Sequence, residues 1–144
     1  MNSFWKKSTP GINRFIKEVT DAVWHNYHGY RDVEFAYKGG RYRLISTGDL
    51  YKMDYTGMPH PMRAYPATYK SQKYAIVNFS DYSRYYTKGK KQLRLKDLIW
   101  AAFGNQDLPQ GHHIICKNGN WHACGITNLE VVANGISRKR SEIL

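Results

Sequence analysis

Residues that favour turns interrupt the chain at short intervals between residues 33 and 93, and this spacing limits the fold more than any other feature of the sequence. The stretches between them are rich in Tyr, Val, Ile and Phe, which is typical of β-strands. The segment VEFAYKGGRYRLIS predicts a hairpin around Gly39 and Gly40, because glycine accepts the positive φ angles of a tight hairpin turn. The segments LYKMD and YAIVNF predict further strands, so we expect a small antiparallel sheet.

Three prolines in the same region, Pro59, Pro61 and Pro66, predict a loop. Proline has no N–H to donate to a neighbouring strand, so a central strand is not expected there. No internal repeat or low-complexity tract stands out along the chain. The region is therefore expected to form one β-rich unit with turns at irregular intervals.

Two stretches with apolar residues at helical spacing flank this region. The first covers residues 10–27, with Ser8, Thr9 and Pro10 as a plausible start. Its apolar positions are Ile12, Phe15, Ile16, Val19 and Val23. The second stretch is LKDLIWAAFG, in which Gly104 is expected to end the helix. Its apolar positions are Leu95, Leu98, Ile99 and Ala102.

The charge of the chain is strongly positive, with 22 Lys and Arg residues against 11 Asp and Glu residues and a formal net charge of +11. Such an excess favours polyanionic partners, and cations interleaved with tyrosines suit contact with nucleic acid. If one face of the sheet is apolar, the other is expected to carry many of the cations. An ordinary solvated basic face is the alternative. The expected nucleic-acid contacts in this region are Arg41, Arg43, Lys52 and Lys73.

The length of 144 residues predicts one compact unit with a modest core. No apolar run approaches the roughly 18 residues of a membrane helix, and the N-terminal MNSFWKKSTP lacks the apolar core of a secretory signal. We therefore expect a cytoplasmic, intracellular protein with no membrane partner. A disulfide between Cys116 and Cys124 is not expected there. With His122 they supply three nearby zinc ligands where four are usual, so a structural zinc is not expected.

The C-terminal part of the chain predicts a strand, a loop, a second strand and a helix in succession. GHHII (111–115) and NLEVV (128–132) are the two strands, and ANGISRKRSEIL is the helix, which Asn134 or Ser137 would cap. Folded back on itself, this unit brings the start of its first strand, Asn128 and the first turn of its helix into one small cluster.

This succession resembles the HNH endonucleases, the ββα-metal or His-Me finger group. The resemblance runs from LKDLIWAAFG through GHHII to TNLEVVANGISR, and it is closest to the enzymes encoded by phages and introns. The upstream segment GRYRLISTGDLYKMDYTG is similar to the small N-terminal module that often accompanies these nucleases. Together the similar segments extend over about residues 24 to 140.

The resemblance implies a role for several residues. His113 holds the position of the general base that activates water, and His112 that of a metal ligand. Asn128 would hold the loop and orient the His113 ring. The family's second ligand stands nine residues beyond Asn128, where this chain has Ser137, and Asn134 is the better donor although it comes three residues early. One divalent ion, Mg²⁺, would stabilise the leaving 3′ oxygen. A histidine ligand in place of a carboxylate would also suit Mn²⁺ or Ni²⁺.

The expected fold class is α+β, with an N-terminal helix, a small basic antiparallel sheet and a C-terminal ββα-metal finger. Residues 1–93 would form the helix and the DNA-binding sheet, and residues 94–144 the nuclease region of one compact unit. Lys117 and Arg138 flank the expected site and would contact the DNA backbone.

The implied function is metal-dependent hydrolysis of double-stranded DNA with 5′-phosphate and 3′-hydroxyl products. A monomer would nick one strand, whereas a homodimer would cut both. Two alternatives stay open: a non-catalytic DNA-binding protein with a degenerate finger, and an RNA-binding protein whose tyrosines stack on bases.

Overall fold

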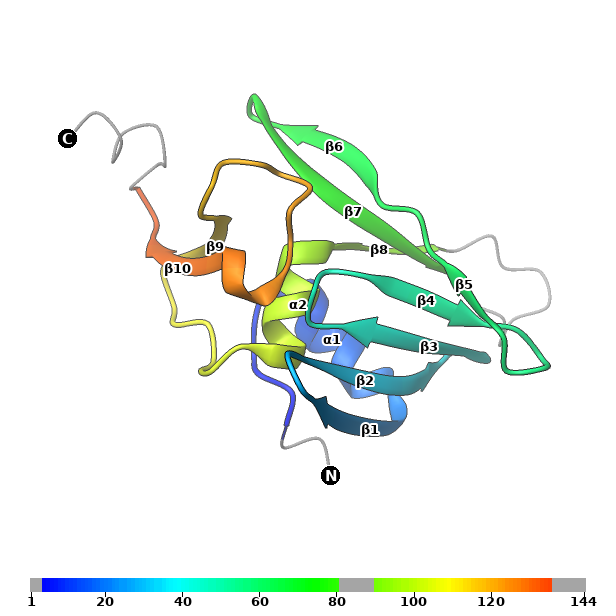
Figure 1. Cartoon of the computed structure of the whole chain (residues 1–144). Coiled ribbons are helices and arrows are strands. Elements are labelled where there is room, and N and C mark those ends of the chain that lie inside the picture. Colours follow the sequence, from blue (N-terminus) through cyan, green and yellow to red (C-terminus); the bar gives the residue numbers. More distant parts are fainter. Residues whose placement is uncertain (1–3, 81–89, 136–144) are drawn as a thin grey trace.

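The computed structural model describes residues 4–80 and 90–135. Within them the chain forms an α+β fold of two short helices and antiparallel sheets (Figure 1). In chain order the elements are α1 (Pro10–Glu18), β1 (Thr20–Tyr27), β2 (Tyr30–Tyr37), β3 (Gly40–Ile45), β4 (Leu50–Met53), β5 (Pro59–Pro61), β6 (Tyr65–Tyr69), β7 (Gln72–Ser80), β8 (Lys90–Arg94), α2 (Leu95–Phe103), β9 (His112–Cys116), the 3₁₀ turn η1 (Ile126–Asn128) and β10 (Leu129–Ala133). The expected α+β class and the presence of an N-terminal helix are confirmed.

The first sheet is a five-stranded meander in the order β1-β2-β3-β4-β5. Its hairpin between β2 and β3 confirms the prediction from the paired glycines, with Tyr37 opposite Gly40. The two-residue turn consists of Lys38 and Gly39, whose φ angles are 47° and 85°. A turn with two positive φ angles follows the twist of the flanking strands, so it sets their register. The strand predicted in LYKMD is β4.

The second sheet has the order β6-β7-β8, and β7 is the strand predicted in YAIVNF. Side chains alternate across it, and one face is buried in the core through Ala75, Val77, Phe79 and Leu93. The opposite face carries Tyr65, Tyr69 and other polar or aromatic residues. This sheet therefore has one apolar and one largely polar face.

The three prolines lie in strands, although a loop was predicted for them. Pro59 and Pro61 are the ends of β5, and Pro66 lies in β6. Both β5 and β6 are outermost strands of their sheets. A proline is tolerated there because only one side of an edge strand must supply ladder hydrogen bonds, and the expectation that no central strand would contain them is confirmed.

The helix predicted over residues 10–27 is much shorter than expected. α1 ends at Glu18, and Val19 is already extended, with its N–H bonded to the Ile16 carbonyl. From Thr20 onward the chain forms β1, and Val23, expected on the buried face of the helix, is 52 % exposed. The strand forms because β1 pairs antiparallel with β2, continuously from Val23 to Tyr27, and such tertiary pairing overrides a local helical pattern.

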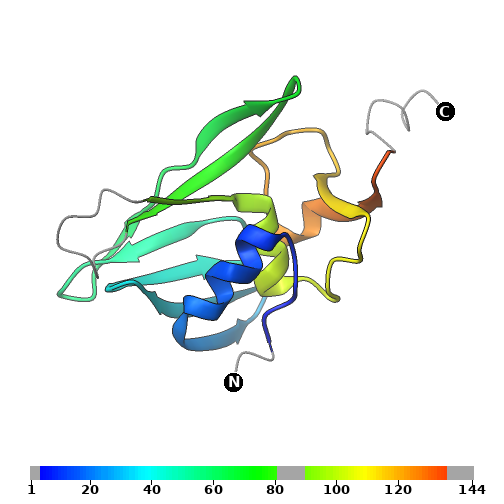
Figure 2. The ribbon, with the colours of Figure 1, turned by 180° about the vertical axis from the view of Figure 1, so that it is seen from behind.

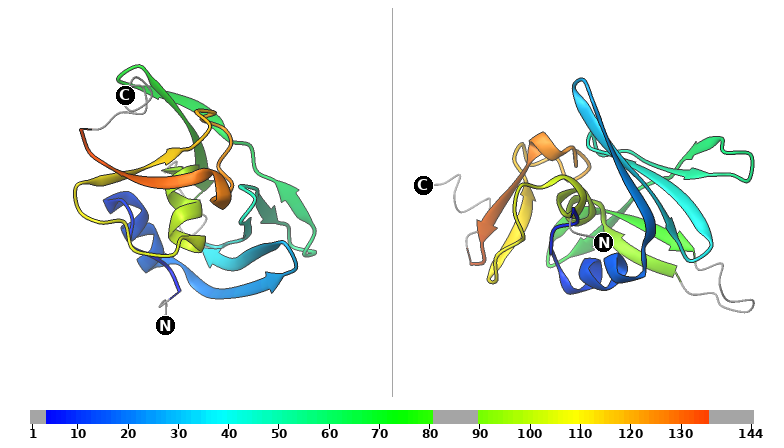
Figure 3. Two further views of the ribbon diagram at one scale, coloured as in Figure 1. Left: turned by 60° about the vertical axis from the view of Figure 1, so that its left-hand side comes forward. Right: turned by 90° about the horizontal axis from the view of Figure 1, so that it is seen from below.

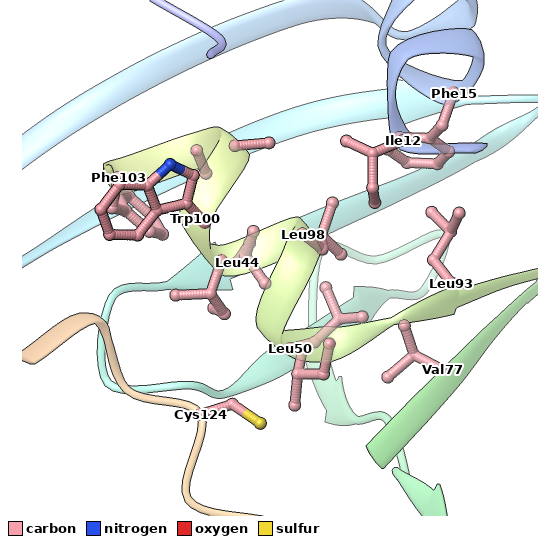
Figure 4. Packing of buried hydrophobic residues seen from close by; sticks show 14 of the residues in the cluster. Ile12, Phe15, Leu44, Leu50, Val77, Leu93, Leu98, Trp100, Phe103 and Cys124 are labelled. Atoms are coloured by element: carbon pink, nitrogen blue, oxygen red, sulfur yellow. The ribbon is translucent and has the colours of Figure 1, made fainter. Parts of the chain in front are cut away.

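The core lies between the two sheets and the helices. α2, predicted in LKDLIWAAFG, is buried along almost its whole length and contacts β7, β8 and β9. α1 packs beside α2 (Figure 2). Its buried Phe15 contacts the rings of Phe35 and Tyr37 on β2 and of Phe79 on β7. In the close-up, Leu98 of α2 stands between Leu44 of β3 and Leu93 of β8 (Figure 4). α2 is thus the element on which the other parts are assembled. Neither described helix is long and apolar enough to cross a membrane.

The cations expected on one basic sheet face are distributed over several surfaces. Arg41 and Arg43 alternate with buried Tyr42 on β3, so they share the outer face of the five-stranded sheet. Lys52 is the cross-strand partner of Tyr42 and therefore lies on the other face. Lys73 belongs to the second sheet. The expectation of one basic face was wrong, because the strands divide into two sheets.

The C-terminal hairpin of β9 and β10 lies on the other side of α2 from the five-stranded sheet (Figure 3). Its loop nevertheless reaches the β3–β4 turn, where the Ile126 N–H donates to the Ser46 carbonyl at 2.8 Å. Two glycines permit this approach. A Cβ on Gly125 would stand 2.9 Å from the Thr47 carbonyl oxygen, and one on Gly48 3.0 Å from the Gly125 nitrogen. Backbone thus packs on backbone at this contact.

Candidate functional site

The strands β9 and β10 form the hairpin that the sequence predicts. They are antiparallel, with Cys116 opposite Leu129 at one end and His112 opposite Ala133 at the other. Ile114, Cys116 and Leu129 are buried, so the hairpin is anchored to the core by one face. The predicted succession of strand, loop and strand is therefore present. Its expected C-terminal helix, with Ser137 and Arg138, lies outside the described residues.

The long loop between the two strands is held by Asn128. The Asn128 Nδ2 donates to the Ala123 carbonyl at 2.7 Å and to the Asn118 Oδ1 at 3.0 Å. Its Oδ1 accepts the Asn118 N–H at 3.3 Å. One amide side chain thus ties both halves of the loop together, as expected for this position. Among the described residues the Asn128 side chain hydrogen-bonds with Asn118 and Ala123 and not with His113, so the expected orienting role falls to another residue.

That residue is Asn134, which follows β10. The His113 Nδ1 lies 2.8 Å from the Asn134 Oδ1, and the Asn134 N–H donates to the Gly111 carbonyl at 2.7 Å. An amide oxygen only accepts hydrogen bonds, so the His113 Nδ1 carries the proton in this pair. The Nε2 then keeps its lone pair. The bond fixes both the tautomer and the angle of the ring.

His112 points away from His113, because consecutive strand residues project to opposite faces. The His112 Nδ1 lies 2.9 Å from the Gln110 carbonyl oxygen, to which it donates. Its Nε2 therefore has a lone pair for a proton or a metal. The expected metal ligand and the expected base are adjacent in sequence and diverge in space.

A cavity of about 240 Å³ opens beside His113. It lies between the tip of the β6–β7 hairpin, the first turn of α2 and β9. The hairpin contributes Tyr69, Lys70, Gln72 and Tyr74, and the other walls contribute Arg94, Lys96, Asp97 and His113. Three cations thus surround the space that the histidine lines.

Two of these cations lie over one tyrosine ring. The Arg94 guanidinium carbon is 4.6 Å from the centre of the Tyr74 ring, and the Lys96 ammonium is 5.6 Å from it. Tyr74 is 8 % exposed, and its hydroxyl has no hydrogen-bond partner in the described part of the chain. The ring holds the two cations at the cavity without neutralising them.

Asp97 is the buried carboxylate of this cavity, with 3 % of its surface exposed. Burial raises the pKa of the Asp97 carboxyl, because the charged form loses its water. The positive charges of Lys96 and Arg94 act in the opposite direction, followed by the contribution of His113. The electrostatic environment of the cavity therefore couples Asp97 to the histidine.

The residues expected to bind nucleic acid lie mostly elsewhere. Arg41, Lys73 and Lys117 are exposed on separate surfaces, and Lys52 is half-buried, with its pKa lowered by burial. Arg43 pairs with the fully buried Asp32: its Nε and one terminal nitrogen both lie 2.6 Å from the Asp32 Oδ2.

The Asp32 carboxylate also binds His25, whose Nδ1 is 2.8 Å from the Asp32 Oδ1. Arg43 thus belongs to a structural ion-pair network on the outer face of the sheet. Such a network leaves little of its charge for a phosphate.

The described residues do not assemble a metal site. No three His, Cys, Asp or Glu side chains in residues 4–80 and 90–135 lie together in a way that could hold an ion. The Asn134 oxygen already accepts from His113, which leaves His112 as a single donor. The next family position, Ser137, is outside the described residues.

The two cysteines lie in the core under the loop. Cys116 and Cys124 are buried and form no disulfide, and both belong to the core cluster, in which Figure 4 labels Cys124. The Cys116 hydrogen bond and burial raise the pKa of the Cys124 thiol. The raised pKa favours the protonated form of the Cys124 thiol.

Sequence reasoning missed the residues that complete the cavity, namely Arg94, Lys96 and Asp97. They occur in LRLKDL, at the point where β8 ends and α2 begins. Two basic residues followed by an acidic residue, in the order Arg94, Lys96 and Asp97, are the sequence signal for this junction of strand and helix. The packing of β9 beside α2 could not be predicted from the local sequence pattern.

A comparison of the chain with protein-family models, with curated proteins and with solved structures finds no match. The functional interpretation therefore rests on the site itself.

Proposed function

We propose that the protein is a DNA endonuclease in which His113 is the general base. The observation that carries the proposal is the His113–Asn134 pair beside a cavity with three cations. A neutral histidine with a fixed Nδ1 proton presents an Nε2 that accepts a proton, and nearby cations suit a phosphodiester. The resemblance of the hairpin sequence to the HNH endonucleases favours the same chemistry.

In the proposed reaction a water molecule attacks the phosphorus while its proton passes to the His113 Nε2. The bond from phosphorus to the 3′ oxygen breaks, and that oxygen takes a proton from solvent water to become the 3′-hydroxyl. The phosphate stays on the 5′ end of the next nucleotide. Arg94 and Lys96 would offset the charge that builds up on the phosphate oxygens. Asn134 keeps the imidazole at the required angle and stabilises the imidazolium through its amide oxygen.

The resemblance also implies one divalent ion, Mg²⁺ or alternatively Mn²⁺ or Ni²⁺. The donors in the described residues do not fit such an ion by themselves, since His112 is a single ligand that faces away from His113. We derive no step through the metal.

The competing proposal is a non-catalytic DNA-binding protein that keeps the hairpin as a scaffold. The missing ligand cluster favours it. Both proposals share double-stranded DNA as the partner, because the net charge of +11 favours a polyanion. Only hydrolysis separates them.

The deciding experiment incubates supercoiled plasmid with the protein in Mg²⁺, Mn²⁺ or EDTA. Conversion to open-circle or linear DNA in metal, with 5′-phosphate ends, supports the nuclease. A gel shift of plasmid and of larger DNA without cleavage under every condition supports the scaffold. The ratio of nicked to linear product separates a monomer from a homodimer that cuts both strands.

A further inference from the structure

The outer face of the β6–β7–β8 sheet combines tyrosines with amide and basic side chains. Its members include Tyr65, Tyr69, Gln72, Tyr74, Asn78 and Arg94, and we call it the tyrosine face. The strand register places Tyr65 opposite Ile76 and Ile76 opposite Arg94, while Tyr69 is opposite Gln72. Paired residues share a face, so these side chains form one continuous surface.

The tyrosine face is accessible and leads into the cavity at His113. Tyr65 and Tyr69 are 44 % and 59 % exposed. Tyr69, Gln72, Tyr74 and Arg94 line the cavity as well. A ligand that lies along this face would therefore reach the candidate base without crossing another element.

Each exposed tyrosine already has a cation at its ring. The Arg63 guanidinium carbon is 5.7 Å from the centre of the Tyr65 ring, and the Lys70 ammonium is 5.3 Å from that of Tyr69. A ring with a cation on one side offers its other side for stacking. Alternating rings and cations match the bases and phosphates of a nucleic-acid strand.

The buried hydroxyl of Tyr74 is the second, independent sign of a ligand. It has no hydrogen-bond partner in the described residues, although buried hydroxyls are usually bonded. Arg94 and Lys96 stand over the same ring. A phosphate oxygen in the cavity would accept from the hydroxyl and from both cations.

We propose that the tyrosine face binds an unpaired stretch within double-stranded DNA, with one backbone phosphate in the cavity beside His113 and bases stacked on Tyr69 and Tyr65. In a paired duplex the bases are stacked on one another, so tyrosine rings on a sheet face reach only exposed bases. The assignment of this strand as the substrate rests on the proposed nuclease function. The binding surface itself does not.

The test is equilibrium binding in EDTA, where metal-dependent cleavage is stopped. Labelled oligo-dT, a duplex with a central unpaired bubble and the same duplex fully paired are titrated with wild-type protein, and fluorescence anisotropy is read. Oligo-dT and the bubble are expected to bind at least tenfold more tightly than the paired duplex. Oligo-U is a fourth probe, expected to bind more weakly than oligo-dT.

Two variants locate the contact. Tyr69→Ala should weaken binding of oligo-dT by about fivefold or more, since it removes one stacked base, whereas Tyr69→Phe should retain most of it. Tyr55→Ala is the matched control, because Tyr55 is fully exposed on the β4–β5 turn, away from this face. Circular dichroism checks that each variant is folded.

Tighter binding of the paired duplex, or equal binding by the Tyr69→Ala and Tyr55→Ala proteins, would overturn the proposal. Tighter binding of oligo-U would overturn its assignment to DNA. The binding result does not depend on hydrolysis. Selective, Tyr69-dependent binding without cleavage in the presence of metal would support binding at the tyrosine face and contradict the proposed nuclease function.

Discussion

At the scale of single residues, the proposed role of His113 as general base depends on one hydrogen bond. The His113 Nδ1 and the Asn134 Oδ1 are 2.8 Å apart, and this contact selects the tautomer with a basic Nε2. Asn134→Ala should lower the cleavage rate by about tenfold or more, as loss of an orienting partner usually does. Asn105→Ala, at an exposed position after α2, is the control. Equal nicking rates for the two variants would show that Asn134 has no part in the reaction.

The resemblance assigned Asn134 to the metal and Asn128 to His113, and the structure places them differently. Asn128 precedes β10 and faces the loop, whereas Asn134 follows it and faces His113. Sequence spacing could not separate the two, since the hairpin register decides which asparagine meets the histidine. The proposal of His113 as the general base came from the order of the motifs alone.

Asp97 gives a prediction for pH. Burial raises the pKa of its carboxyl, so the folded protein binds this proton more tightly than the unfolded chain does. The bound proton therefore contributes stability at low pH, and this contribution is lost as the pH rises through the pKa of Asp97 in the folded protein. Asp97→Asn should raise the melting temperature at pH 7, and the gain should shrink to nothing as the pH falls below 3.8.

The control for Asp97→Asn is Asp21→Asn. Asp21 is exposed with a φ of 55°, a conformation that asparagine adopts as well. The control should melt like the wild type at both pH values. A melting temperature of Asp97→Asn that does not depend on pH would contradict the assigned effect of burial.

At the scale of elements, the loop of the β9–β10 hairpin is joined to the five-stranded sheet by a backbone contact. Gly125 has a φ of −62°, which alanine also adopts, so its substitution tests space alone. A Cβ there would stand 2.9 Å from the Thr47 carbonyl oxygen. Gly125→Ala should therefore cost about 1–3 kcal/mol of unfolding free energy, measured by urea denaturation, and faster exchange of the Ile126 amide should accompany it.

Gly11→Ala is the matched glycine control. Gly11 lies in α1, and a Cβ there meets only the Leu93 side chain, at 3.9 Å. Alanine favours a helix over glycine, so this variant should be unchanged or more stable by about 0.5 kcal/mol. A Gly125→Ala protein as stable as the Gly11→Ala protein would mean that the β9–β10 loop and the β3–β4 turn are not closely packed.

The elements that sequence reasoning located best are those whose pattern is local. The Gly39 hairpin, α2 and the strands β9 and β10 are confirmed, because turn chemistry and apolar spacing act within a few residues. β1 was missed, since its helical spacing is overridden by pairing with β2. The division into two sheets was missed for the same reason: which strands become neighbours depends on contacts far apart in the chain.

At the scale of the whole molecule, the net charge of +11 favours polyanions, and we expect only some of the cations to contact the proposed DNA partner. Lys96→Gln and Lys17→Gln each remove one positive charge. Lys96 lines the cavity, whereas Lys17 is exposed in the last turn of α1. Lys96→Gln should reduce the slope of log affinity against log salt by about 0.7 for a single strand, and Lys17→Gln should leave it unchanged. Equal slopes for both variants would indicate non-specific attraction.

The most direct test of the central claim is the nicking rate of supercoiled plasmid in Mg²⁺ or Mn²⁺ by wild type, His113→Ala and His28→Ala, each with and without added imidazole. His28 is an exposed histidine in the β1–β2 turn and serves as the control. We predict that His113→Ala loses at least about a hundredfold in rate, within the range for a general base, and that imidazole restores part of it. Nicking that survives in His113→Ala at the wild-type rate, or that is absent from the wild type, would contradict the account.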